Sequence, residues 1–239
     1  RNPRAPVFLY ASSCVFLRFT GTGFGVILKN KRLFYRNFIG FSIDGHAPGC
    51  AEITRDDEAV RMELARGLEN GEHEAVLFKR MDSCHQFEFY GFLLDSGSRV
   101  LPAKPLPERK LEFYGDSVTC GEVCEAVEYV GKQDPVHSGE YSNAWYSYAM
   151  IAARKLNAQI HNVSQGGVAL LDGAGYFCEP KALGMESCYD KLNYSPQLGP
   201  LTKWDFSRYT PHAVIVAVGQ NDAHPVSYTH LTLPTIYSV

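Results

Sequence analysis

The chain has 239 residues, of which 45% are hydrophobic and 13% aromatic, and its formal net charge is -3 at pH 7. This composition is typical of a well-packed globular protein with one large domain or two modest ones, and it excludes the disordered and fibrous classes. The charge gives no basic field for nucleic acid, and no apolar run approaches the roughly 20 residues that cross a bilayer. We therefore expect neither nucleic acid nor a membrane as a partner, while the oligomeric state and the compartment stay open.

The first hundred residues have the pattern of an antiparallel β domain. Turn signals at residues 20–23, 44–45 and 70–72 separate short apolar runs at hairpin-like spacing. The expected strands are 15–19, 25–28, 38–43, 75–78 and 87–94. This pattern favours a β-sandwich over a βαβ unit, and we predict such a domain over residues 1–101.

A proline-rich segment, residues 102–109, is predicted to be an extended linker, because three prolines disfavour both helix and strand pairing. Strands are expected afterwards at 111–114, 159–163 and 213–219. A helix over 143–156 is expected to begin at the N-cap Ser142, with Trp145 on its apolar face. Alternating strands and helix predict a parallel α/β domain over residues 110–225.

The seven cysteines are odd in number and scattered, unlike the dense pairs of a small disulfide-rich domain. Cys120 and Cys124 are four residues apart, but no second Cys/His pair has matching zinc spacing. We expect structural thiols, with no metal and no cofactor.

The last fourteen residues, 226–239, resemble the translation of a sequencing adapter. We expect this tail to be non-native and the natural gene to continue beyond it, so His230 is given no role.

Gly115-Asp116-Ser117 follows the apolar strand 111–114 and presents a serine on a tight turn. Such a turn suits a nucleophile, which needs a base to take its proton and fixed donors for the oxyanion that it creates. The same tripeptide is also an ordinary turn with a helix cap. Asp116 is expected to support the turn by accepting backbone N–H bonds.

Two further polar blocks follow predicted strands, residues 162–167 and residues 219–222. Open α/β sheets assemble their sites at the carboxyl ends of strands, so the three blocks are expected to meet there. Taken alone, Gly166 and Gly167 could form a simple tight turn, and Asn221 could cap a helix.

Together the three blocks resemble blocks one, two and three of the SGNH, or GDSL, hydrolases. The resemblance implies that Ser117 is the nucleophile. It also implies an oxyanion hole made by the Ser117 N–H, a glycine N–H and the Asn221 side chain. Gly167 fits the family spacing from Asn162 better than Gly166 does.

The whole arrangement resembles carbohydrate esterase family 2. The stretches that carry this similarity are 19–22, 43–45, 71–73, 79–80, 112–121 and 204–211. The resemblance implies a jelly-roll domain packed on an SGNH domain, which has a flavodoxin-like three-layer α/β fold. It also implies a serine esterase that removes acetyl groups from plant-type polysaccharides or oligosaccharides. The alternatives are a non-catalytic glycan-binding protein and an SGNH esterase or lipase for another acyl group.

The sequence departs from the family at the catalytic histidine. An Asp-x-x-His block is expected after residue 225 and is not present, and Asp222-x-His224 has the wrong spacing for it. We therefore expect the general-base histidine to be absent from a C-terminally truncated chain. This chain should then lose about four powers of ten in turnover and be inactive.

Overall fold

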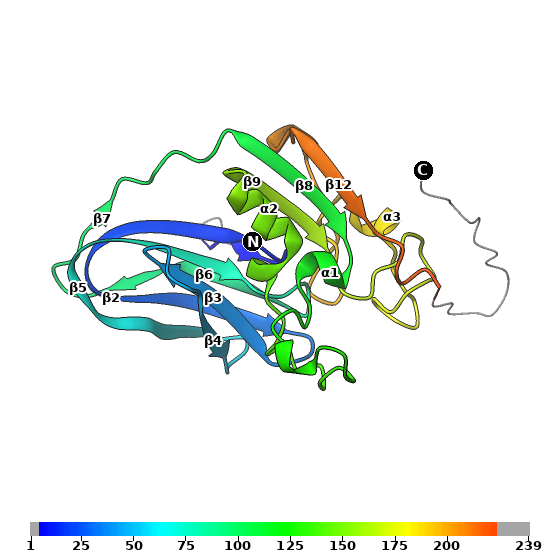
Figure 1. The fold of residues 1–239 in the computed structure, drawn as a ribbon, viewed down its shortest axis with the longest axis horizontal. Helices are drawn as coiled ribbons and strands as arrows, with labels where there is room; N and C mark the ends of the chain where they lie inside the picture. The colour runs from blue at the N-terminus through cyan, green and yellow to red at the C-terminus, as the bar shows by residue number, and fades with distance from the viewer. Residues whose placement is uncertain (1–4, 224–239) are drawn as a thin grey trace.

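The structure is a computed structural model that describes residues 5–223. The expected tail 226–239, with His230, and His224 lie outside the described residues. Figure 1 shows long, curved antiparallel strands on one side and a smaller parallel sheet with helix α2 on the other.

The antiparallel sheet has the order β1-β6-β2-β5-β3-β4, with β7 also paired to β2. Its strands are β1 (Val7–Phe8), β2 (Cys14–Arg32), β3 (Asn37–Ile43), β4 (Gly49–Ile53), β5 (Ala59–Lys79), β6 (His85–Leu94) and β7 (Val100–Leu101). The antiparallel pairing expected from the sequence is confirmed.

Two of the predicted turns are wrong, because residues 20–23 lie inside β2 and residues 70–72 lie inside β5. The two strands pair across Gly21 and Gly71, and their register shifts between Gly21 and Gly23. Gly21 has φ +137, and a Cβ there would lie 2.2 Å from Ser98 Oγ. Glycine therefore bends a continuous strand here instead of ending it. The turn at Asp44 and Gly45 is confirmed, and both residues have positive φ.

The core of this sheet consists of alternating apolar side chains from its strands. Phe19 and Phe24, on either side of the bend in β2, are buried, and their ring centroids are 5.7 Å apart. Other buried members include Leu17, Val26, Leu28, Ile39, Ile53, Leu77 and Phe87. The bend thus brings the two halves of one long strand onto a shared core.

The parallel sheet has the order β12-β8-β9, with strands β8 (Arg109–Gly115), β9 (Ala158–Ser164) and β12 (Ala213–Ala217). Its predicted parallel pairing is confirmed. Leu111 and Phe113 of β8 pack on Ala149 and Ala153 of α2 (Tyr148–Lys155). Residues 102–108 connect β7 to β8 without regular structure (Figure 1), so Arg109, predicted as linker, already belongs to a strand.

The predicted helix 143–156 is wrong in its first turn. Asn143 caps a short 3₁₀ helix, η2 (Ala144–Tyr146), by accepting a bond from the Trp145 N–H. Ser147 then caps α2 by accepting a bond from the Met150 N–H. Two successive capping side chains thus replace the one cap expected at Ser142. The remaining short elements are α1 (Ser117–Cys120), η1 (Val127–Tyr129), α3 (Met185–Cys188), β10 (Lys191–Asn193), β11 (Thr202–Lys203) and η3 (Phe206–Arg208).

Over residues 5–223, none of the helices combines the length and the apolar character that a bilayer span requires.

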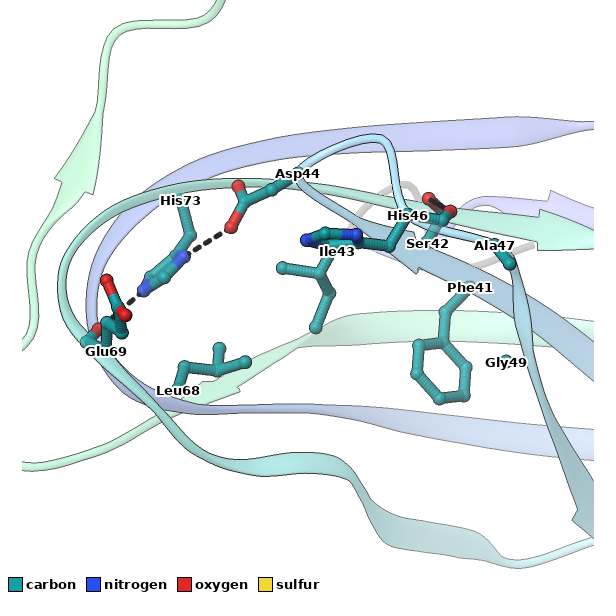
Figure 2. Close-up of a pocket in the computed structure, with 10 residues that line it drawn as sticks. All are labelled: Phe41, Ser42, Ile43, Asp44, His46, Ala47, Gly49, Leu68, Glu69 and His73. Carbon is teal, nitrogen blue, oxygen red and sulfur yellow. Dashed lines mark hydrogen bonds and ion pairs between the residues drawn. The ribbon is translucent and has the colours of Figure 1, made fainter.

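A cleft of about 520 Å³ lies within the antiparallel sheet (Figure 2). At one end of it, Asp44 Oδ2 lies 2.7 Å from His73 Nδ1, and His73 Nε2 lies 2.8 Å from the Glu69 carbonyl oxygen. The hydrogen bond to Asp44 raises the pKa of His73, although burial opposes this shift. The pair therefore ties the turn after β3 to β5.

Replacing His73 with alanine is expected to lower the free energy of unfolding by about 1.5–3 kcal/mol at about pH 6, where the imidazolium bonds to a carboxylate. Because the folded-state pKa of His73 is raised, its contribution is complete below the unfolded pKa and is lost as pH rises through the folded pKa. The loss should therefore shrink at about pH 9. Urea unfolding of the unmodified protein and the variant at both pH values measures the change in the free energy of unfolding. His46→Ala, at an exposed residue of the same cleft, is the control, and an equal loss at both pH values would contradict the assignment.

Candidate active site

A cavity of about 600 Å³ brings together residues from all three polar blocks of the sequence. Ser117, Gly167 and Asn221 each line it. They follow β8, β9 and β12, whose parallel pairing places their carboxyl ends at one edge of the sheet. Residues of the three blocks therefore line one cavity.

Ser117 is half-buried and begins α1 directly after β8. Asp116 is the N-cap, and its Oδ1 accepts a bond of 3.1 Å from the Val118 N–H, as expected from the sequence. A Cβ at Gly115 would lie 1.9 Å from Thr119 Oγ1, so only glycine fits there. The helix ends after one turn at Gly121, which has φ 76. These residues confine the serine to a tight strand-to-helix turn.

The two glycines of the second block differ in what their backbones do. The Gly166 N–H donates to Asp82 Oδ2 at 2.7 Å, so it is already engaged. Gly167 has φ +76, and a Cβ there would lie 2.9 Å from the Cβ of Tyr176. Gly167 is therefore held in a left-handed conformation at the cavity wall.

The third block is anchored to the segment that follows the second. Asn221 Nδ2 donates to the Val168 carbonyl oxygen at 2.9 Å. The Asp222 carboxylate accepts the Leu170 N–H, with oxygen–nitrogen distances of 3.0 and 3.1 Å. A primary amide has two N–H donors, so one bond orients Asn221 and leaves a second donor.

Sequence reasoning missed a buried polar network behind the second block. Gln165 donates through Nε2 to Asp82 Oδ2 at 2.7 Å, and its Oε1 accepts from the Ser83 N–H at 3.2 Å and the Tyr194 hydroxyl at 3.0 Å. Asp82 and Ser83 come from the loop between β5 and β6, so the antiparallel sheet supplies part of this site. Glu122, just after α1, also lines the cavity. Burial, followed by the neighbouring Asp82, raises its pKa to about 8.

Aromatic side chains and one imidazole form other parts of the cavity wall. Phe34 and Tyr35 come from the segment between β2 and β3, and Tyr176 comes from the segment after β9. His137 lies in a loop with its ring 6.4 Å from Tyr35, and it is exposed. No motif in the sequence marked these residues, because each comes from an irregular segment placed by the tertiary fold.

Asp82, Cys120 and Glu122 have potential metal-ligand atoms within 4.8 Å of one another. Burial raises the pKa of the Cys120 thiol well above its usual value and also raises that of Glu122. Both groups therefore carry protons near neutral pH. Cys120 and Cys124 are both free thiols.

Residues 1–104 match the family model described as "Carbohydrate esterase 2 N-terminal". Over 222 residues the chain is 32% identical to the "Cellulase/esterase CelE" of Acetivibrio thermocellus, an alignment that covers 92% of this chain and 25% of that protein. It is 32% identical over 190 residues to the "Acetylxylan esterase / glucomannan deacetylase" of Cellvibrio japonicus, covering 79% of this chain and 50% of the relative. The chain thus spans between a quarter and a half of these curated relatives.

Solved structures give the same result. A family two carbohydrate esterase from Clostridium thermocellum, in complex with cellohexaose, superposes with a TM-score of 0.77 at 31% identity, covering 92% of this chain and 63% of that one. The family two esterase from Cellvibrio japonicus gives a TM-score of 0.74 at 26% identity, covering 92% and 62%. The chain is thus similar in both sequence and fold to the family two carbohydrate esterases.

Proposed function

We propose that this protein is a carbohydrate O-acetyl esterase that acts by serine acyl transfer. The observation that carries the proposal is the meeting of Ser117, Gly167 and Asn221 in one cavity at the carboxyl ends of β8, β9 and β12. The relatives, an acetylxylan esterase and glucomannan deacetylase among them, supply the reaction class.

In the proposed reaction the Ser117 hydroxyl attacks the acetyl carbonyl carbon, and its proton passes to a base. The Ser117 N–H, the Gly167 N–H and Asn221 Nδ2 stabilise the oxyanion. The engagement of Gly166 by Asp82 supports Gly167 as the glycine donor. As the oxyanion collapses, the bond between the acetyl carbon and the sugar oxygen breaks, and the base returns the proton to that oxygen, which leaves as a hydroxyl. Water then cleaves the acetyl–serine bond and releases acetate.

We further propose a jelly-roll β-sandwich domain over residues 1–101, a linker over 102–109 and a three-layer SGNH domain over 110–225. Two observations support this division. The two larger sheets share no strand, and residues 102–108 form an irregular connection between them. The β-sandwich domain is also a candidate for glycan binding.

The substrate class is an acetylated oligo- or polysaccharide. Phe34 is 41% exposed and Tyr176 is 52% exposed, and both lie at the cavity. Exposed aromatic rings supply large, rigid apolar contact area. Such rings suit the flat apolar faces of sugar rings. The similar family two carbohydrate esterase from Clostridium thermocellum binds cellohexaose, which agrees with this substrate class.

The test measures acetate release from acetylated xylo- and manno-oligosaccharides. A second arm of the test adds imidazole as an external base. We expect release near the background rate without imidazole, faster release with it, and release at the background rate in Ser117→Ala under both conditions. A preference for long-chain esters would favour the lipase alternative. Oligosaccharide binding without Ser117-dependent release under either condition would favour the non-catalytic alternative.

A further inference from the structure

One buried carboxylate binds the backbone and the side chain on either side of the peptide bond between Gln165 and Gly166. Asp82 Oδ2 accepts the Gly166 N–H and Gln165 Nε2, each at 2.7 Å. Asp82 Oδ1 accepts the Cys84 N–H at 3.0 Å. Asp82 is 3% exposed, so these three N–H donors replace water around it. The carboxylate therefore fixes the peptide that directly precedes Gly167.

A second carboxyl group lies against the same peptide. A carboxyl oxygen of Glu122 lies within 4.8 Å of a carboxyl oxygen of Asp82. A Cβ at Gly166 would lie 2.1 Å from Glu122 Oε1, so Glu122 packs closely against the turn. Two ionised carboxylates this close repel each other and have no proton to share, so a hydrogen bond between them requires that one of them is protonated. Asp82 already accepts three N–H bonds, and burial, followed by the neighbouring Asp82, raises the pKa of Glu122, so we assign the proton to Glu122.

We propose that Glu122 is a positioning residue whose neutral carboxyl group donates to Asp82, and that this pair holds the Gly166–Gly167 turn with the Gly167 N–H facing the cavity. The inference rests on the proposed function, in which Gly167 supplies an oxyanion donor. It adds two residues from separate segments of the chain that none of the three sequence blocks contains.

The surroundings of Glu122 keep its proton in place near neutral pH. Burial is the largest cause of its raised pKa of about 8, followed by Asp82 and then Asp116. Three neutral groups also face it, the Cys84 and Cys120 thiols and the Tyr35 hydroxyl. His137 lines the same cavity. The cation beside Asp82 is Lys79, whose pKa burial lowers to about 8.

The proposed pair should therefore fail as pH rises. A glutamate whose folded-state pKa is raised contributes stability that is complete below its unfolded pKa and is lost as pH rises through the folded value. Once Glu122 ionises, two negative charges face each other behind Gly166. The turn should then open more often, and its backbone N–H groups should exchange faster with solvent.

The test compares the unmodified protein with Glu122→Gln and Glu122→Ala, with Glu108→Gln in the exposed connection as the matched control. Glutamine is a neutral isostere that still donates to Asp82. Amide hydrogen exchange of Gly166 and Gly167 is measured by NMR at about pH 6 and about pH 9.5, corrected for intrinsic exchange. We expect protection of the Gly166 N–H to fall by about tenfold to a hundredfold at high pH in the unmodified protein and in the control. Glu122→Gln should keep its protection at both pH values, and Glu122→Ala should lose it at both.

Equal pH dependence in Glu122→Gln and the unmodified protein would overturn the proposal. If neither variant folds, the carboxyl ¹³C shift of Glu122 in the unmodified protein decides, because ionisation well below neutral pH is incompatible with a donated bond to Asp82. These readouts need no turnover. Missing acetate release with intact exchange behaviour would therefore count against the proposed function and leave the positioning role standing.

Discussion

Asn221→Ala is expected to lower Ser117-dependent, imidazole-assisted acetate release by about a hundredfold to a thousandfold, the usual effect of removing one oxyanion-hole donor. The amide of Asn221 is oriented in advance by its 2.9 Å bond to the Val168 carbonyl oxygen. A donor that is already in place stabilises the oxyanion without reorganisation, so the loss should fall on kcat, with KM little changed. Steady-state kinetics on an acetylated oligosaccharide measures both parameters.

The matched control is Gln197→Ala, because Gln197 lines the same cavity but belongs to none of the three blocks. Its kcat should change by less than about tenfold, as for a residue that contacts only the substrate's ground state. Equal kcat values for Asn221→Ala and the unmodified protein would remove Asn221 from the oxyanion hole. Loss of binding in both variants alike would show that Asn221 acts in substrate binding instead.

The sequence predicted the residues at the strand ends because a regular rule places them. Polar blocks after β8, β9 and β12 must meet if the strands are parallel neighbours, and the pairing of these strands brings Ser117 and Asn221 to one cavity. The capping role of Asp116 was predictable for the same reason, since it depends on a contact two residues away along the chain.

Asp82 and Glu122 could not be predicted in this way. They are 40 residues apart in the sequence, and Asp82 reaches Gln165 and Gly166 from the loop between β5 and β6. A contact between a loop of the antiparallel sheet and a loop that follows a strand of the parallel sheet leaves no periodicity or local spacing in the sequence. The turn predicted at residues 20–23 was wrong for a related reason. Glycine is a turn signal in the local sequence, but Gly21 pairs with Gly71 of β5, and this pairing lets β2 bend without ending.

Phe78→Ala is expected to lower the free energy of unfolding by about 3–5 kcal/mol, the usual range for deleting a buried aromatic side chain. Phe78 lies on β5 and has no exposed surface. Its ring stacks on Trp145 with centroids 4.6 Å apart, and a Cβ at Gly40 would lie 2.1 Å from its Cζ. Neighbours this close cannot fill the space that the ring leaves, so a cavity should remain between the antiparallel sheet and η2. Denaturant unfolding followed by circular dichroism measures the loss.

Phe16→Ala is the matched control, because Phe16 lies on the paired strand β2 but is 61% exposed, and its loss should stay within about 0.5 kcal/mol. A double-mutant cycle with Trp145→Ala separates the stacking from simple burial. Its coupling energy should be about 0.5–1.5 kcal/mol, as for other aromatic pairs. Strictly additive losses would show that Phe78 only fills the core of its own sheet. A measurable coupling would mean that the same β5 segment that leads to Asp82 also fixes the position of η2, and with it the start of α2 against the parallel sheet.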